Sequence, residues 1–278
     1  MMLAETVSEM SEGPLAAFNM NDKDRYELKI AGLLHDCGKV TTPVHVVDKA
    51  TKLETIYDRI HIIDTRFEVM KRDAEIELLK EKALLVAHGA AQAEHDAADA
   101  RYRWTDTSGH EANFLSEDEL KNLIIRAGTL TGDERQIINH HIVATIKMLE
   151  ALPWPKHLMN VPEYAGGHHE RMDGKGYPKG LTREQMSVQA RVMGIADIFE
   201  ALTAKDRPYK KGKTLSESLE ILGRMRLNGH VDPDLFDVFV RKKVYRRYAD
   251  LFLDKEQIDE VDESKIPGYL PGRAAPKL

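Results

Sequence analysis

Two histidine-rich motifs limit how this chain can fold. The first is His35-Asp36, and the second is the adjacent pair His168-His169, which opens the stretch from His168 to Pro178. Neutral imidazole and carboxylate are ligands that borderline divalent metals prefer, and adjacent ligands can reach two ions at once. A fold that uses both motifs must bring together segments that lie far apart in the sequence.

A further histidine pair, His140-His141, lies in a predicted helix that begins at Thr131 with a capping box. His141 follows Ile137 and Ile138 by one helical turn, so it falls on the apolar face of this helix. His140 falls on the polar side. We therefore expect His141 to be a metal ligand and His140 to face solvent.

A lone carboxylate, Asp197, lies in a predicted helix from about Ser187 to Ala204. It shares a face with the small or apolar residues Ala190, Met193, Gly194 and Ala201. An unpaired carboxylate on such a face would be costly, so Asp197 needs a cation or strong hydrogen-bond donors. With the histidine motifs, it makes a candidate centre for two or three divalent metal ions.

The composition favours a helical protein in a reducing compartment. Charged residues make up 31% of the chain and aromatic residues only 6%, and strong helix formers dominate the periodic segments. The net charge of −6 argues against a nucleic-acid polymer as a partner, and the single cysteine, Cys37, excludes an internal disulfide. No apolar run approaches the roughly 18 residues of a membrane-spanning helix, and the N-terminus has no signal pattern. We expect a cytoplasmic protein that does not contact a membrane.

Helix signals surround the motifs. Residues 22–40 are predicted to form a helix that starts near Asn21 and is ended by Pro43, so that His35-Asp36 lies near its C-terminal end and faces inward. Two final helices are predicted after the helix that carries Asp197, the second with Asp232 as its N-cap and Pro233 in its first position. Residues 266–278 contain three prolines and are expected to form a flexible tail.

A charged segment separates His35-Asp36 from the later motifs. Residues 55 to about 100 have the spacing of a long helix, and Ser116 with Glu119 predicts a capping box at the start of a return helix. We interpret residues 55–127 as an inserted antiparallel helical hairpin between two parts of a core, residues 1–54 and 128–265. Its charges favour a solvated surface over a specific partner surface, although self-association or a protein partner remains open.

The order of these motifs resembles that of HD-GYP domains, the branch of the HD phosphohydrolase superfamily that hydrolyses cyclic di-GMP. The motifs that carry the resemblance are His35-Asp36 with Gly38-Lys39, His141, His168-His169-Glu170, Gly176-Tyr177-Pro178, Asp197 and Arg207-Pro208-Tyr209. The resemblance covers roughly residues 31–53 and 128–239. It implies an all-α helical bundle and a metal-dependent phosphodiesterase that converts cyclic di-GMP to pGpG, GMP or both.

The resemblance also implies a role for each motif. Asp36 and Lys39 would be catalytic, with Asp36 bridging two divalent ions, iron or manganese. The implied metal ligands are His35, Asp36, His141, His168, His169 and Asp197. The implied substrate-binding residues are Lys39, Gly176, Tyr177, Pro178, Arg207 and Lys210. Lys39 would contact phosphate or protonate the leaving oxygen, although a lysine there would also interact with the helix dipole.

One departure from the family pattern leaves alternatives open. Many relatives carry an additional metal-binding glutamate and histidine upstream, whereas no histidine precedes His35 here. We therefore expect either a fragment of a longer regulatory protein or an impaired binuclear centre. The alternatives to the phosphodiesterase are a cyclic di-GMP receptor or interaction module that uses the hairpin, and an HD phosphohydrolase for another nucleotide. The Gly-Tyr-Pro motif argues against the last of these.

Overall fold

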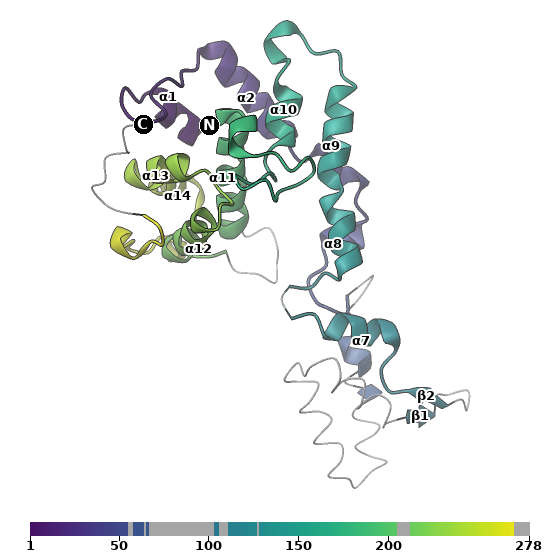
Figure 1. Ribbon diagram of the computed structural model, residues 1–278. Helices are drawn as coiled ribbons and strands as arrows, with labels where there is room; N and C mark the ends of the chain where they lie inside the picture. The colour runs from purple at the N-terminus through teal and green to yellow at the C-terminus, as the bar shows by residue number, and fades with distance from the viewer. Residues whose placement is uncertain are drawn as a thin grey trace. The chain divides into compact units, whose positions relative to one another are not determined.

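The computed structural model describes residues 1–54, 58–63, 65–66, 103–105, 111–126, 128–204 and 212–269 (Figure 1). The chain divides into two compact units. The first consists of Met1–Thr41 and His140–Leu278, and the second of Thr42–Asn139. The interval predicted as an insertion, residues 55–127, belongs to the second unit. Most of its predicted long helix lies outside the described residues.

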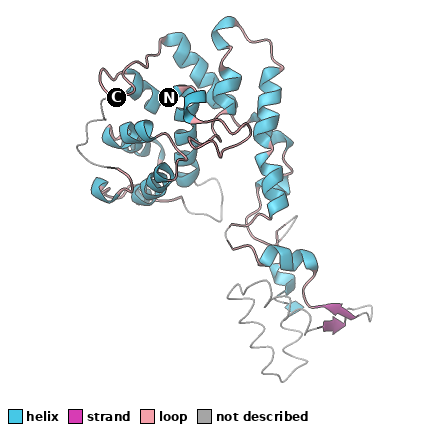
Figure 2. Cartoon of the chain, viewed as in Figure 1, coloured by secondary structure: helices cyan, strands magenta, loops and turns pink. Residues whose placement is uncertain are grey.

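The described residues of the first unit form helices and loops (Figure 2), as the all-α prediction stated, and the helices include short 3-10 turns. Its α-helices are α1 (Met2–Ser8), α2 (Asp22–Leu34), α9 (His141–Glu150), α10 (Val161–Gly166), α11 (Val188–Thr203), α12 (Leu215–Leu227), α13 (Pro233–Arg241) and α14 (Val244–Phe252). Its 3-10 turns are η1 (Cys37–Thr41), η2 (Lys156–Leu158), η3 (Arg183–Gln185), η4 (Lys255–Gln257) and η5 (Glu263–Lys265). Within the described ranges, no helix combines the length and the apolar character needed to cross a bilayer.

The described residues of the second unit form short helices and a small β-hairpin. These elements are α3 (Val44–Val47), β1 (Arg103–Thr105), β2 (Glu111–Asn113), α7 (Glu117–Leu123) and α8 (Gly132–Asn139). The strands pair antiparallel with Trp104 opposite Ala112, and the sequence did not predict them. The start of the predicted return helix is confirmed, because Ser116 and Glu119 form a capping box at the first turn of α7.

A buried lysine links three segments of the second unit. The ammonium group of Lys49 lies 2.8 Å from both carboxylate oxygens of Glu134 and 2.7 Å from Oδ1 of Asn122. Glu134 also accepts a hydrogen bond from the backbone N–H of Thr131, which confirms the capping box predicted there. Lys49 thereby ties the segment after α3 to α7 and to the start of α8.

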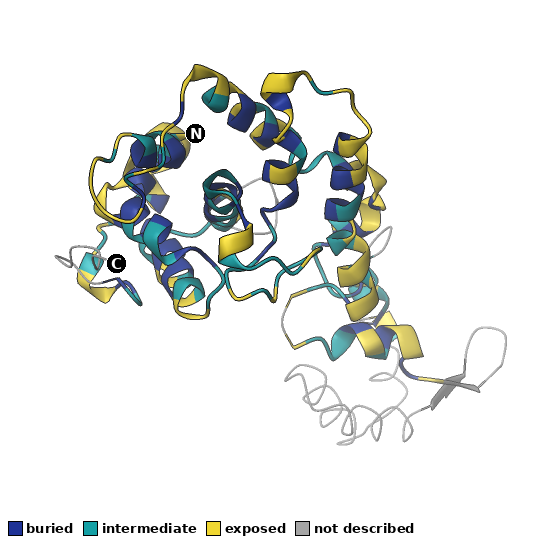
Figure 3. Cartoon of the chain, turned by 45° about the horizontal axis from the view of Figure 1, so that its top comes forward, coloured by how far each residue is buried: buried dark blue, intermediate teal, exposed yellow. Residues whose placement is uncertain are grey.

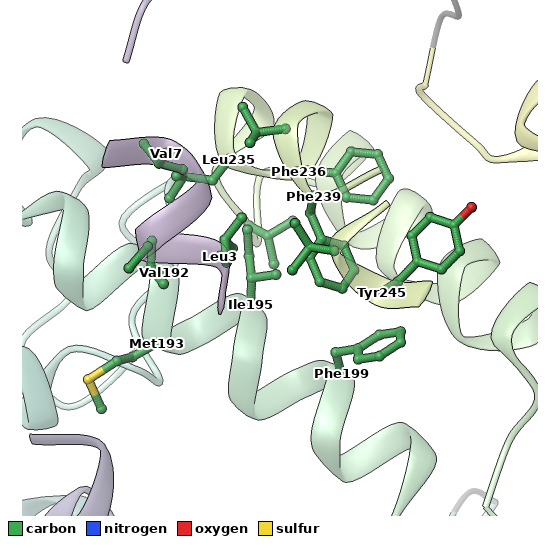
Figure 4. Close-up of a cluster of buried hydrophobic side chains, with 14 of the residues drawn as sticks. Leu3, Val7, Val192, Met193, Ile195, Phe199, Leu235, Phe236, Phe239 and Tyr245 are labelled. Carbon is green, nitrogen blue, oxygen red and sulfur yellow. The ribbon is translucent and has the colours of Figure 1, made fainter. Parts of the chain in front are cut away.

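Helix α11 supplies one side of the core of the first unit. It begins after Ser187, whose hydroxyl accepts a hydrogen bond from Ala190, and its bounds agree with the predicted helix. Val192, Ile195 and Phe199 are buried and pack with residues of α1, α13 and α14 (Figure 4). The helices of this unit carry both buried and exposed stretches (Figure 3), as amphipathic helices do. One face of α11 is thus committed to the core.

Helix α2 is shorter than predicted. Its start is as expected, since Asn21 is the N-cap of a capping box with Asp24. It ends at Leu34 rather than continuing to residue 40, and the chain then forms η1, in which Lys39 donates a backbone hydrogen bond to the carbonyl of Asp36. The reason lies in helix α9, because the chain must turn after α2 for η1 to lie against it.

The C-terminal part also differs from the prediction. Three helices follow residue 212 instead of two, because Lys243 adopts a left-handed conformation (φ 50°) that separates α13 from α14. Asp232 caps α13 and Pro233 occupies its first position, as predicted. Ile266 and Tyr269 were assigned to a flexible tail, but both are buried in the core. Residues 270–278 lie outside the described residues.

The contact of η1 with α9 depends on a glycine. The backbone N–H of Gly38 donates to Oγ1 of Thr145 at 2.9 Å, and a Cβ at Gly38 would lie 2.1 Å from the carbonyl oxygen of His141. No side chain fits in that space. Asp36, two residues before Gly38, is therefore held beside the first turn of α9.

We predict that Gly38→Ala destabilises the protein by about 1 to 3 kcal/mol, because the methyl group forces η1 and α9 apart. Gly32→Ala is the matched control: Gly32 lies within α2 and nothing lies within 4 Å of its Cβ position. That change should raise stability by roughly 0.5 to 1 kcal/mol through helix propensity. Chemical denaturation of both variants tests this. Equal effects of the two changes would disprove the close approach.

Candidate metal centre

His35 and Asp36 occupy the turn between α2 and η1. The Nδ1–H group of His35 donates to the carbonyl of Gly32 at 2.8 Å, which leaves Nε2 to face the centre of the site. His35 Nε2 lies 3.3 Å from Oδ2 of Asp36 and 3.5 Å from Oδ1 of Asp197 on α11. His35, which follows α2, and Asp197 on α11 therefore lie in contact.

The two oxygens of Asp36 face different neighbours. Oδ1 lies 3.3 Å from Nε2 of His141 and 3.8 Å from Nε2 of His168. Oδ2 lies beside Nε2 of His35 and accepts a hydrogen bond from the Lys39 ammonium group at 2.6 Å. The carboxylate of Asp36 therefore lies between His35 on one side and His141 with His168 on the other.

The adjacent histidines follow the end of α10. His168 is 2% exposed, and its Nδ1–H group donates to the carbonyl of Ala165 at 2.7 Å, so that Nε2 points towards Asp36. Nε2 of His169 lies 3.2 Å from Nε2 of His141. Two imidazole nitrogens at this distance need a proton or a cation between them, since both carry a lone pair when deprotonated.

For the other histidine pair, the predicted burial of His141 and exposure of His140 are confirmed, whereas one detail of the helical prediction is wrong. His141 is 3% exposed and His140 is exposed, as expected. Ile137, which was expected on the buried face, is 43% exposed. The predicted single helix is divided: α8 ends at Asn139 and α9 begins at His141, so Ile137 and His141 belong to different helices.

These residues fit a divalent metal. Oδ1 of Asp36 and Nε2 of His168 are buried and make no hydrogen bond within the described part of the chain. Such atoms are costly unless a ligand or ion satisfies them. Two sets of ligand atoms each lie within 4.8 Å of one another: His141 with His168 and His169, and His35 with Asp36 and His168. Imidazole and carboxylate groups in this arrangement suit iron, manganese or zinc.

The electrostatics of the site favour added positive charge. Burial by itself would lower the pKa of His35, but its contacts with Asp197 and Asp36 outweigh burial and raise this pKa to about 10. Burial would raise the pKa of Asp36, yet His141, His35 and Lys39 hold it far below its usual range. A proton on His35 thus compensates the carboxylates in the absence of a metal, and a cation would do the same.

The imidazoles on the other side of Asp36 have the opposite tendency. Burial, followed by the proximity of His168, lowers the pKa of His169 to about 3. Burial also lowers the pKa of His168. Both rings are therefore neutral near pH 7, which is the form that binds metals.

The stretch after the paired histidines forms a loop beside the site. The ring of Tyr177 stacks on that of His169, with 4.9 Å between the ring centroids and 19° between the planes. The peptide bond between Tyr177 and Pro178 is cis. Gly176 packs on the backbone of Glu170 and Arg171, where a Cβ would clash. The substrate-binding candidates Arg207 and Lys210 lie outside the described residues.

The sequence did not predict a role for Glu170, the third residue of the His168-His169-Glu170 motif. Its carboxylate is buried and accepts hydrogen bonds from the backbone N–H groups of Lys179 and Leu181. The only signal in the sequence was its place beside the paired histidines. Its partners follow nine and eleven positions later, which no helical or strand periodicity predicts.

A cavity of about 780 Å³ opens beside His35, Asp36 and Asp197. Apolar residues of α2 and α11 line it, together with the ammonium-bearing side chains of Lys29 and Lys39. Its volume lies within the range of about 300 to 1,000 Å³ that is typical of small-molecule sites. A phosphate-containing ligand could thus lie next to the carboxylates and the candidate metal ligands.

Comparison with known proteins gives consistent matches. The family model described as HD domain matches residues 117–235, which include His141, the paired histidines and Asp197. The chain is 37% identical, over 43% of its length and 28% of the relative's, to a cyclic di-GMP phosphodiesterase of Pseudomonas aeruginosa. It is 31% identical, over 46% of its length and 35% of the relative's, to a cyclic di-GMP phosphodiesterase of Thermotoga maritima.

The name of another relative indicates a different cyclic dinucleotide as its substrate. A 3'3'-cGAMP-specific phosphodiesterase of Vibrio cholerae is 44% identical over 29% of this chain and 19% of the relative. The chain thus spans about a third or less of the length of these relatives. The matched stretch and the clustered His and Asp side chains agree with the motif order, and residues 117–235 are similar to an HD domain.

Proposed function

We propose that this protein is a metal-dependent phosphodiesterase that hydrolyses cyclic di-GMP to pGpG, GMP or both. The observation that carries the proposal is a cluster of four imidazoles and two carboxylates, those of Asp36 and Asp197. The relatives that bear the name cyclic di-GMP phosphodiesterase support the choice of substrate. Iron and manganese are the proposed metals, because mixed imidazole and carboxylate ligation suits both.

Two divalent ions at such a site would act as Lewis acids on the phosphate and lower the pKa of a nucleophilic water. Asp36 is the proposed bridging ligand, because its Oδ1 faces His141 and His168 while its Oδ2 faces His35. His35 and Asp197 would complete one ligand set, and the remaining histidines the other. The backbone carbonyls that accept from Nδ1 of His35 and His168 keep each Nε2 directed at the centre.

Lys39 is the proposed phosphate contact. Its side chain is 44% exposed and lines the cavity, while its ammonium group lies 2.6 Å from Oδ2 of Asp36. A lysine so placed can neutralise a nonbridging phosphate oxygen or donate a proton to the leaving oxygen. Tyr177, Gly176 and Pro178 remain proposed substrate contacts, as do Arg207 and Lys210.

A related substrate is the second candidate. The Vibrio cholerae relative named for 3'3'-cGAMP supports testing that dinucleotide beside cyclic di-GMP. A receptor without catalytic activity is the remaining candidate, with the segment at residues 55–127 as its proposed partner surface or site of self-association. Tight binding of cyclic di-GMP by the metal-loaded protein without any product would favour the receptor.

We predict that the purified protein contains at least two iron or manganese ions per chain. His169→Ala should lower the metal content, because it removes a neutral imidazole from the cluster with His141 and His168. His140→Ala is the matched control, since that side chain is exposed and belongs to neither ligand set. Elemental analysis of the two variants measures this. Equal metal loss in both would show that the site does not distinguish the adjacent histidines.

We also predict that Asp36→Ala lowers hydrolysis of cyclic di-GMP by several orders of magnitude, because it removes the group between the two ligand sets. Lys39→Ala should cost less, roughly 2 to 4 kcal/mol of transition-state stabilisation, because the ligand sets remain. Chromatography of products formed with Mn²⁺ or Fe²⁺ measures both effects. Activity of Asp36→Ala close to that of the unchanged protein would disprove the mechanism.

A further inference from the structure

His169 is supported differently from two other imidazoles of the centre. His35 and His168 each donate from Nδ1 to a backbone carbonyl oxygen. Among the described residues, the hydrogen-bond contact of His169 is at Nε2, with His141, and Nδ1 makes none. Metal-binding histidines are normally oriented through the nitrogen that does not face the metal. The ring of His169 therefore needs another means of orientation.

The ring of Tyr177 provides it. The two ring planes differ by 19° and their centroids lie 4.9 Å apart, which is a stacked arrangement. The backbone N–H of Tyr177 also donates to the carbonyl of His169 at 3.3 Å. A parallel ring beside the imidazole restricts its rotation about the Cβ–Cγ bond. The direction of Nε2 thus depends on where Tyr177 is held.

Glu170 holds the loop that carries Tyr177. Glu170 is 3% exposed, and each of its carboxylate oxygens accepts a separate backbone hydrogen bond. Oε1 accepts from Lys179 at 2.7 Å, and Oε2 accepts from Leu181 at 2.9 Å. These two bonds attach the returning end of the loop to the residue that directly follows His169.

Gly176 lets the first part of the loop pack closely on the backbone of Glu170 and Arg171. A Cβ at this position would lie 2.4 Å from the backbone nitrogen of Arg171 and 2.5 Å from Cα of Glu170. Only glycine allows the loop backbone to pack on this turn. Tyr177, the next residue, then lies over the His169 ring. The loop is therefore held on both sides of Tyr177.

We propose that Tyr177 and Glu170 are positioning residues of the metal centre: Glu170 holds the loop, and Tyr177 orients the imidazole of His169 for the metal ion. This inference rests on the proposed function only in that the site binds a divalent metal. It does not require cyclic di-GMP to be the substrate. In this proposal, Glu170 and the Gly-Tyr-Pro residues act together to orient the imidazole of His169.

Titration of the metal-stripped, full-length chain with Mn²⁺ tests the role of the ring. Tyr177→Leu should weaken binding at one site by about 10- to 100-fold, as loss of outer-shell support does in other metal sites. Tyr177→Phe keeps the stacked ring and should bind Mn²⁺ within about twofold of the unchanged protein. Circular dichroism verifies that each variant is folded, which is expected because Tyr177 is only half-buried.

Glu170→Gln tests the loop attachment. The glutamine amide can accept from one backbone N–H but presents N–H groups to the other, so one bond is lost. We expect weaker Mn²⁺ binding at the same site and faster hydrogen exchange at the amides of Lys179 and Leu181. Glu119→Gln is the matched control, because Glu119 is also 3% exposed and accepts a backbone hydrogen bond, from Ser116 in the second unit. The Mn²⁺ affinity of that variant should equal that of the unchanged protein.

Unchanged Mn²⁺ affinity of Tyr177→Leu would overturn the proposal, and a raised KM alone would then assign Tyr177 to substrate contact. Faster exchange in Glu170→Gln without weaker Mn²⁺ binding would also overturn it, because the attachment would not reach His169. A protein that binds Mn²⁺ but leaves cyclic di-GMP intact would disprove the proposed substrate while the titration still decides this inference. Absence of any Mn²⁺ binding by the unchanged protein would overturn both.

Discussion

The candidate site depends on the direct contact between the η1 turn and helix α9. Gly38 donates its backbone N–H to the hydroxyl of Thr145, which is fully buried, and no side chain separates the two segments. Because Asp36 and His141 flank this contact, the carboxylate oxygen and the imidazole nitrogen lie 3.3 Å apart. Any widening between η1 and α9 would separate Asp36 from the imidazoles it joins.

The same packing creates the electrostatic need for a cation. Asp36 and Asp197 are partly removed from water and face one another through His35. Without a metal, the raised pKa of His35 holds a proton between them. On the other side of Asp36, burial keeps His168 and His169 in the neutral form that binds metals. Asp36 thus lies between a proton-holding imidazole and a group of imidazoles that burial favours in the neutral form.

The loop after the paired histidines connects the candidate metal centre to the second half of the motif. Glu170 satisfies two loop amides that would otherwise be unpaired near the site, and Gly176 lets the loop pack on that same turn. Tyr177 is then stacked on His169. In the proposed arrangement, metal binding and the shape of the substrate side are set by one short segment. Changes in this segment would therefore affect both.

The sequence by itself determined the helical class, the types of candidate ligand and the helix starts at Asn21, Ser187 and Asp232. Each of these starts depends on a cap whose partners lie within three residues, so local chemistry was sufficient. Motif order also identified the residues that meet around Asp36. The early end of α2, the burial of Ile266 and the attachment of the loop by Glu170 were decided by tertiary structure.

The physical reason is the range of the interactions. Gly38 and Thr145 are 107 positions apart, and their hydrogen bond, not a local stop signal, explains why the chain leaves α2 at Leu34. Ile266 and its neighbour Pro267 pack on α12 at Gly223, where a Cβ would lie 2.4 Å from the Pro267 carbonyl oxygen. Such close approaches need a glycine on one segment and a backbone from another. The sequence contains both partners, but only the folded chain shows which of them meet.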